Sequence, residues 1–295
     1  MELEVKVKQK RLQGWMTAAG LYGVFGCLIP YISATPLGWV GALVGAILAL
    51  IIAPKSLPRW LKQCRALWGL GAAALSLGEC ARGMVAYTYP HWSPWVPCLL
   101  LLAVGWRGSR LDQKARERCG KLLVWLMLAM TTVLVVLVLP RLELQFEQPR
   151  GREDIWDAAQ VAALTFGCLG VITPLEGRRA GAITTLSGAL AGGVSVSALG
   201  PGLAGMLTYP FLVLCDAAVF ELRLSSLGTA MWALSESALL MVLLGRLCGG
   251  KWVKAVACGG VFLLSLTTPW PDSVTVGYLI VGALLGYTPY FVWKV

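Results

Sequence analysis

Apolar residues in this chain gather into long runs that short polar segments separate. Several runs approach or exceed the roughly 20 residues that an α-helix needs to cross about 30 Å of hydrocarbon. Residues 201–223 are also apolar, but prolines and glycines interrupt them, which favours a re-entrant or surface helix over an independent span. We therefore predict ten membrane-spanning helices, at approximately residues 12–34, 37–53, 61–87, 91–106, 120–140, 154–174, 179–200, 225–245, 252–268 and 274–293.

The composition leads to the same class of protein. Hydrophobic residues make up 57% of the 295 positions, and charged residues only 14%. A soluble protein of this length could not bury so much apolar surface in one core. We therefore expect an all-α polytopic membrane protein, integral to a cell membrane, with the lipid bilayer as its immediate partner.

The basic residues alternate along the chain. Lysines and arginines outnumber aspartates and glutamates by 25 to 15, which gives a net charge of +10. Most of them fall in every second polar segment, for example between residues 107 and 121, and the intervening segments hold few. This is the positive-inside pattern, and it predicts that both termini are cytoplasmic. Because the basic residues are spread over short loops, we expect no nucleic-acid partner.

One motif occurs twice at corresponding places. The spacing Gly-x-x-Gly-x-x-x-Pro runs from Gly23 to Pro30 in the first predicted helix and from Gly167 to Pro174 in the sixth. Ten helices thus divide into two repeats of five, which we place at residues 1–150 and 151–295. Because five is odd, the second repeat enters the membrane in the opposite orientation, as in transporters with inverted repeats.

We expect the first helix of each repeat to break at its motif, since glycine weakens a helix and proline removes a backbone donor. The freed amides can bind a carboxylate and the freed carbonyls an ammonium group or a cation, inside a cavity that the protein encloses. We therefore predict a ligand-binding site at Gly23, Gly26, Gly167 and Gly170. The alternative is that these glycines only let helices pack closely. Their matched positions in the two halves favour the binding site.

Two glutamates lie inside predicted helices. Glu79 falls in the third helix, where Arg82 three residues later can pair with it, so we expect a structural ion pair there. Glu236 lies in the eighth helix between two serines and has no such neighbour in sequence. A carboxylate in the membrane is costly, so a proton carrier, a ligand contact or a hydrogen-bonded structural group are all open for it. Both glutamates are secondary candidates for the ligand-binding site.

Other kinds of chemistry leave no pattern in the sequence. The chain contains no phosphate-binding glycine loop, no cluster of metal ligands and no Ser/His/Asp set with credible spacing. The nine cysteines form no C-x-x-C pair and fit small buried apolar residues. We therefore expect no enzyme, no cofactor and no metal site.

A longer pattern covers residues 205–245. The segment Gly-Met-Leu-Thr-Tyr-Pro-Phe-Leu-Val-Leu begins at Gly205, Phe-Glu-Leu-Arg-Leu-Ser-Ser-Leu begins at Phe220, and Trp232 follows. This run resembles the B subunit of nutrient germinant receptors, the spore germination permease family. The stretch from Phe166 to Pro174, with two arginines after it, is similar too. The resemblance covers roughly residues 160–245.

The resemblance implies the fold of the amino acid–polyamine–cation transporter superfamily and a place in the inner membrane of a spore. It also implies a small nutrient ligand, such as an amino acid, and A- and C-type receptor subunits as partners. On this basis we expect a germinant receptor subunit that binds a solute between helices one and six. A proton- or cation-coupled amino-acid transporter and a structural sporulation membrane protein that binds no solute are the alternatives.

Overall fold

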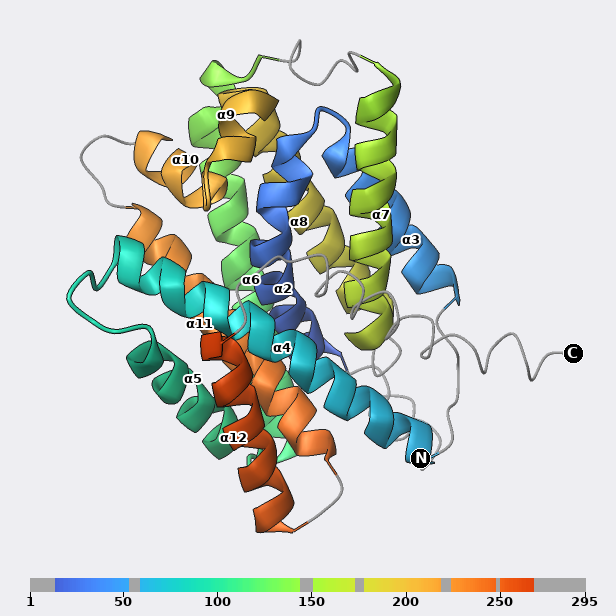
Figure 1. The fold of residues 1–295 in the computed structure, drawn as a ribbon, viewed down its shortest axis with the longest axis vertical. Helices are drawn as coiled ribbons and strands as arrows, with labels where there is room; N and C mark the ends of the chain where they lie inside the picture. Colours follow the sequence, from blue (N-terminus) through green and yellow to red (C-terminus); the bar gives the residue numbers. More distant parts are fainter. Residues whose placement is uncertain are drawn as a thin grey trace, which may run out of the picture.

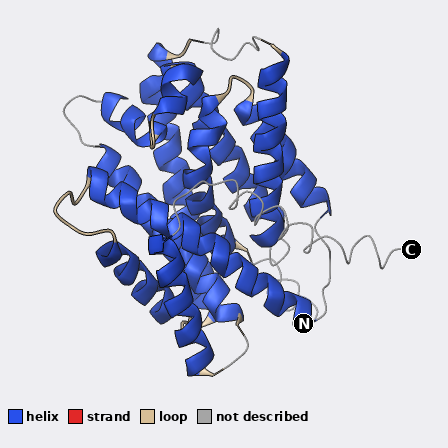
Figure 2. Ribbon diagram, in the orientation of Figure 1, coloured by secondary structure: helices blue, strands red, loops and turns tan. Residues whose placement is uncertain are grey.

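The computed structural model describes residues 14–52, 59–143, 151–172, 178–218, 224–247 and 250–267. These residues form eleven α-helices and one short 3₁₀ turn, with no β-strand among them (Figures 1 and 2). The helices are α2 (Trp15–Ala34), α3 (Gly38–Ile52), α4 (Arg59–Tyr87), α5 (Trp95–Gly108), α6 (Gln113–Val138), α7 (Arg152–Ile172), α8 (Arg178–Leu199), α9 (Pro201–Met206), α10 (Pro210–Ala218), α11 (Leu224–Arg246) and α12 (Lys251–Thr267).

Nine of the predicted helices correspond one by one to α2 through α8, α11 and α12. The tenth, at residues 274–293, lies outside the described residues, as do both termini. The largest difference is at α6, which begins at Gln113 rather than near residue 120. Asp112 explains the earlier start, because its side chain accepts a hydrogen bond from the Gln113 amide at 2.9 Å and caps the polar first turns.

The segment between α8 and α11 contains short helices, as the sequence predicts. In its described part, α9 has 6 residues and α10 has 9, so neither is long enough to cross a membrane. Both lie at one end of the bundle, and α9 packs beside the end of α2 (Figure 1).

The predicted break in the first helix is wrong. The α2 helix is continuous from Trp15 to Ala34 and contains Pro30 within it. Pro30 cannot donate to the carbonyl of Gly26, but the following turn is tied back because the Ser33 hydroxyl donates to the Ile29 carbonyl at 2.7 Å. The loss of one backbone bond near the end of a buried helix is therefore not enough to unwind it.

The second motif does not break its helix at the glycines either. The α7 helix continues through Gly167 and Gly170 and ends at Ile172. Pro174 lies outside the described residues. A break at the two glycines is therefore wrong, because glycine alone costs only about 1 kcal/mol in a helix interior, and the break at Pro174 stays a prediction.

Helices from the two predicted halves interleave around α2, which runs through the middle of the bundle (Figure 1). The most extensive contacts of α2 are with α8 and α11, and those of α3 are with α7 and α8. On the other side of the molecule α4 packs on α11 and α12, and α5 packs on α11. One large apolar core cluster accordingly combines residues from both halves, such as Phe25, Leu77 and Leu243.

Glycines set how closely several of these helices approach. On α3, a Cβ added to Gly41 would lie 3.0 Å from the Ala158 carbonyl carbon of α7, and one added to Gly45 would lie 2.9 Å from that of Ala162. On α8, a Cβ at Gly188 would lie 2.9 Å from the Cβ of Phe25 on α2, and Gly192 meets Ile32 of α2 in the same way. Larger residues at these positions would force the helices apart.

Among the described residues, three helices are long and apolar enough to cross a membrane, judged by length and composition. They are α2, α6 and α11. Shorter apolar helices also lie in α3, α5 and α8. These findings agree with the membrane class that the sequence predicts.

Candidate functional site

The helices α2 and α11 meet along a row of glycines. Gly20, Gly23 and Gly26 of α2 face Leu239, Glu236 and Trp232 of α11, in that order. The closest contact with backbone atoms is at Gly20, where an added Cβ would lie 2.7 Å from the Leu239 Cα and 2.8 Å from its amide nitrogen. Close packing, which the sequence left as the alternative for this motif, is thus what these α2 glycines do. We call this contact the α2–α11 seam.

Trp232 is the largest side chain of the seam. Its indole Nε1 donates a hydrogen bond to the Gly23 carbonyl at 3.0 Å, and its ring lies against Gly26. The ring also makes an edge contact with Tyr209, with the ring centroids 5.9 Å apart. Trp232 therefore joins α2 and α11 to the segment between α9 and α10.

Glu236 is fully buried beside Gly23. Its Oε1 accepts a short hydrogen bond from the Ser76 hydroxyl of α4, and the Ser76 hydroxyl in turn lies 3.2 Å from the Cys27 thiol of α2. Its Oε2 has no hydrogen-bond partner among the described residues. An ionised carboxylate is costly in such a place, and a protonated carboxyl fits it better.

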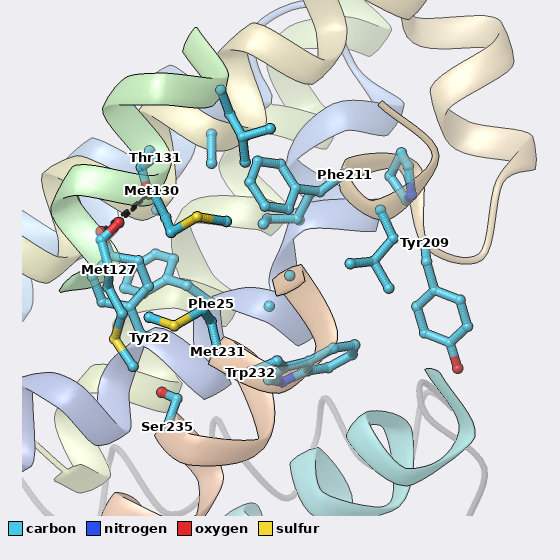
Figure 3. Close-up of a pocket in the computed structure, with 18 of the residues that line it drawn as sticks. Tyr22, Phe25, Met127, Met130, Thr131, Tyr209, Phe211, Met231, Trp232 and Ser235 are labelled. Atoms are coloured by element: carbon cyan, nitrogen blue, oxygen red, sulfur yellow. Dashed lines mark hydrogen bonds between the residues drawn. The ribbon is translucent and has the colours of Figure 1, made fainter. Parts of the chain in front are cut away.

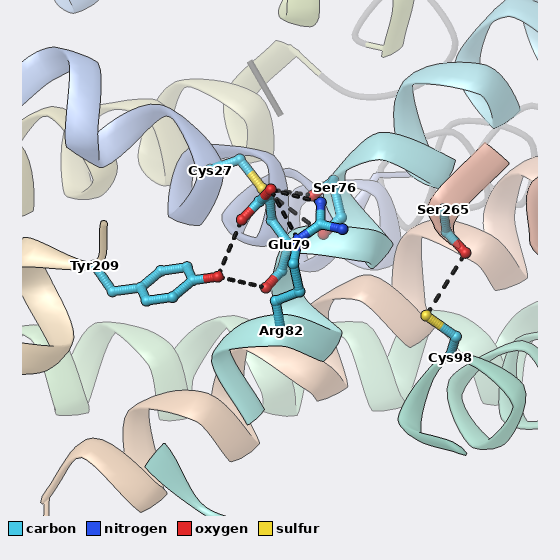
Figure 4. Close-up of polar contacts among 7 residues, drawn as sticks. All are labelled: Cys27, Ser76, Glu79, Arg82, Cys98, Tyr209 and Ser265. Atoms are coloured by element: carbon cyan, nitrogen blue, oxygen red, sulfur yellow. Dashed lines mark hydrogen bonds and ion pairs between the residues drawn. The ribbon is translucent and has the colours of Figure 1, made fainter. Parts of the chain in front are cut away.

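Glu79 lies one turn further along α4, in a polar network (Figure 4). Arg82 donates to Glu79 Oε1, with Nη2 at 2.6 Å, which confirms the predicted ion pair. The Tyr209 hydroxyl donates to Glu79 Oε2 at 3.0 Å. Glu79 is 7% exposed. Both of its oxygens accept from partners, one on α4 and one in the segment before α10.

A polar cavity of about 280 Å³ adjoins this network. Glu79, Gly26, Cys27 and Trp232 contribute to its lining from inside the bundle. The space is much larger than the roughly 10–15 Å³ that one water needs, so it can hold a small solute. Its other lining residues are Pro30, Tyr31, Ala34, Gly205, Met206, Leu207, Thr208 and Tyr209.

The polar cavity has its mouth at the end of the bundle formed by α9 and the last turn of α2. Ala34, Gly205, Met206 and Thr208 are exposed there, whereas Cys27 at the inner end is buried. A Cβ added to Gly205 would lie 3.4 Å from the Cβ of Ala34, so α9 touches α2 at the mouth. In the orientation predicted from the basic residues, this end lies on the outer side of the membrane.

An apolar cavity of about 90 Å³ lies on the other side of Trp232. It is bounded by α2, α6, α8, α10 and α11, and three methionines, Met127, Met130 and Met231, gather around it (Figure 3). Trp232 and Tyr209 contribute to the lining of both cavities. Gly26 and Pro30 of α2 also line both, so these four residues lie between the polar cavity and the apolar one.

Four of the six residues predicted for the site come together. Gly23 and Glu236 contact each other, and Gly26 and Glu79 both line the polar cavity. Gly167 and Gly170 lie in α7, and neither is among the residues that line the polar cavity or contact the α2–α11 seam. The arrangement that we observe therefore joins helices one, three and eight, rather than helices one and six.

Sequence reasoning missed three residues of this site. Tyr209 and Trp232 line both cavities, and the Ser76 hydroxyl donates a hydrogen bond to Glu236. Trp232 appeared only within the family resemblance, and Tyr209 only as part of the same run. Their local sequence carries no signal for this role, because the contacts that define it join residues of different segments, such as Ser76 with Glu236 and Tyr209 with Trp232.

Comparison of the chain with models of known protein families gives no match, and none of the curated proteins compared with it matches. Within the part of the chain that the structure describes, no group of three or more His, Cys, Asp or Glu residues is placed to hold a metal ion. The chemistry of the site therefore has to be argued from its own residues.

Proposed function

We propose that this chain is a membrane protein that binds a small solute carrying an ammonium group, such as an amino acid, in the polar cavity. The observation that carries this proposal is the position of Glu79 in the wall of that cavity. Its carboxylate already accepts from Arg82 and Tyr209, and as the acidic group of the lining it attracts an ammonium group. Gly26 adds a second acceptor, because Pro30 removes the amide that would normally bond its carbonyl.

The distribution of apolar side chains supports a membrane location. On α6 the exposed residues include Leu122, Trp125 and Val136, with exposed fractions of 70%, 58% and 59%. Trp252 and Val256 of α12 are exposed to a similar degree. Such a surface would aggregate in water, and lipid is the environment that suits it.

The pairing of helices supports a five-plus-five repeat. In such a repeat α2 corresponds to α7, α3 to α8, α4 to α11 and α5 to α12. The contact of α2 with α8 then matches that of α7 with α3, and the contact of α4 with α12 matches that of α11 with α5. The pairs α3–α8 and α4–α11 correspond to themselves. All these pairs are among the most extensive in the molecule. Two repeats with five crossings each would have opposite orientations.

The glycine crossings support the same repeat in sequence. Gly41 and Gly45 are the first and fifth residues of the run Gly-Ala-Leu-Val-Gly-Ala in α3. Gly188 and Gly192 hold the same places in the run Gly-Ala-Leu-Ala-Gly-Gly in α8. The first pair packs on α7, and the second pair packs on α2. In each case the second helix of one repeat thus packs through matching glycines on the first helix of the other.

Nutrient sensing as a germinant receptor subunit is the role that we propose for this binding. It rests on the resemblance of residues 205–245, in which Tyr209 and Trp232 line both cavities. Coupled transport is the second candidate, and Glu236 favours it. A fully buried carboxyl beside α2 that can gain or lose a proton is the kind of group that a proton-coupled carrier uses.

Binding can be tested on the purified protein in detergent. Thermal unfolding in the presence of single amino acids and simple amines identifies a ligand, since a bound solute stabilises the folded state by mass action. We expect Glu79→Gln to weaken the affinity for that ligand by at least about tenfold, because a hydrogen bond to a charged group contributes roughly 1.5–3 kcal/mol. Glu153→Gln, the same change at an exposed residue of α7, is the matched control and should leave the affinity unchanged.

The two roles give different results in proteoliposomes. A receptor binds the solute without accumulating it, whereas a carrier takes it up, and Glu236→Gln should then abolish uptake while binding remains. If no solute binds, or if Glu79→Gln binds it as tightly as the unchanged protein, the proposed site is wrong. Only the absence of any bound solute would leave the structural sporulation protein as the remaining candidate.

A further inference from the structure

A third cavity lies at the opposite end of α2 from the polar cavity. It has a volume of about 190 Å³ and sits between the beginning of α2, the beginning of α6 and the end of α11. Its polar lining comes from Gln113, Arg116 and Glu117 of α6 and from Arg246 of α11, and Met16 lies on its apolar side. In the predicted orientation this is the cytoplasmic end of the bundle.

The guanidinium group of Arg116 contains a donor that forms no hydrogen bond with the described residues. Its Nε is buried and has no hydrogen-bond partner among the described residues. Its Nη1 packs against Gly245 of α11, 2.5 Å from where a Cβ of that residue would lie. Buried donors are almost always paired in folded proteins, so this N–H is a position for an acceptor that comes from outside the described chain.

Arg246 brings a second guanidinium group to the same cavity. Its two terminal nitrogens are buried. The backbone of Arg246 is fixed as well, because the Gln63 side chain of α4 donates to its carbonyl at 3.2 Å. The cavity therefore has two arginines from two helices, with the Nε of Arg116 and both terminal nitrogens of Arg246 buried.

Glu117, the acidic residue in the lining, is engaged with α2. Its Oε2 accepts from the Trp15 amide at 3.1 Å, and both of its oxygens lie 3.3 Å from the Gly14 amide. These contacts satisfy the first amides of α2, where a carboxylate is stabilised by the helix dipole. Glu117 is thus directed to the beginning of α2, and the two arginines leave the cavity with a net positive lining.

We propose that this cavity is an anion site that binds a phosphate group. Guanidinium groups pair with phosphate oxygens through parallel N–H donors, and this pairing is strongest where water is excluded. The phosphate could be inorganic phosphate from the cytoplasm or the headgroup phosphate of a phospholipid in the inner leaflet. The site is separate from the proposed solute site and does not depend on it.

The site can be tested with the whole protein in detergent and in nanodiscs. Equilibrium dialysis with radiolabelled inorganic phosphate, at constant ionic strength, measures the soluble ligand. Native mass spectrometry after incubation with phosphatidylglycerol or phosphatidylcholine measures the lipid, since both carry the headgroup phosphate. We expect Arg116→Gln to weaken the ligand that binds by at least about tenfold, because it removes one charge-assisted pair.

Arg118→Gln is the matched control, because Arg118 is an exposed residue of the same helix and does not line the cavity. It should leave binding within about twofold. Arg246→Gln provides an independent second variant in case Arg116→Gln does not fold. Saturable binding of either phosphate source that depends on Arg116 or Arg246 supports the proposal. No binding of either source overturns it, and so does an equal loss in Arg118→Gln, which would mean attraction to the basic surface alone.

Discussion

The α2–α11 seam gives a sharp prediction, because at Gly20 the added Cβ would meet backbone atoms of α11. We consider Gly20→Ala, which adds one methyl group to α2. The new Cβ would lie 2.7 Å from the Leu239 Cα, whereas ordinary van der Waals contact begins at 3.4 Å. A side chain can rotate away from such a clash, but the backbone of a buried helix cannot. The two helices would have to separate by about 0.7 Å, the difference between these distances.

The magnitude follows from two opposing contributions. Alanine is better than glycine in a helix interior by about 1 kcal/mol, so the substitution gains that much in α2 itself. Overpacking of a tight core costs about 1–3 kcal/mol. We therefore expect Gly20→Ala to be about 1–3 kcal/mol less stable than a Gly→Ala substitution at an open helical position.

Gly259→Ala on α12 is that reference, because nothing lies within 4 Å of its added Cβ. Both variants would be purified in detergent and unfolded by heating at one scan rate, since unfolding of such proteins is often irreversible. Gly259→Ala should raise the unfolding temperature or leave it unchanged, and Gly20→Ala should lower it. Equal unfolding temperatures for the two variants would mean that α2 and α11 do not approach as closely as described.

Two further predictions concern the polar cavity. Trp232→Phe removes the indole hydrogen bond to the Gly23 carbonyl but keeps an aromatic ring. Such a bond contributes about 0.5–1.5 kcal/mol, so the unfolding temperature should fall in the same thermal assay, and an unchanged temperature would contradict the role of that bond. The double substitution Ala34→Cys with Gly205→Cys should form a disulfide under mild oxidation, because the Cβ of Ala34 and a Cβ built on Gly205 lie 3.4 Å apart. Closure of the mouth should then stop solute binding, which reduction restores; binding that persists in the oxidised protein would mean that the solute enters elsewhere.

The positions of the helices could be predicted from the sequence because lipid imposes one simple rule. A segment that crosses the membrane must be apolar over its whole length, and this leaves a long run in the sequence. The prolines between residues 201 and 223 likewise mark where short helices begin. Pro201 and Pro210 are the first residues of α9 and α10, a position that proline favours. The start of α6 was missed because its first turns are polar, and a capped polar turn leaves no apolar signal.

The functional site could be predicted only in part, because the same glycine has two possible effects. Glycine weakens a helix, but it also lets another helix come close, and the sequence does not say which effect decides. In this protein the residues that face the α2 glycines determine which effect prevails. They are more than 200 residues away in sequence, at Leu239, Glu236 and Trp232. The contact between Gly23 and Glu236 is therefore a property of the packed bundle that neither local pattern contains.

The tight helix contacts also restrict how a solute can reach the polar cavity. α2 is fixed to α11 through Gly20, Gly23 and Gly26, and to α8 through Gly188 and Gly192. Separation of α2 from either neighbour would open contacts that no side chain is available to fill, at a cost in dispersion and cavity formation. The contact between α9 and α2 at the mouth is looser, at 3.4 Å, and its residues are exposed. Movement of α9 and the segment that follows it is therefore the less costly way into the cavity, and a rocking motion between the halves, with α2 parting from α11, is the more costly one.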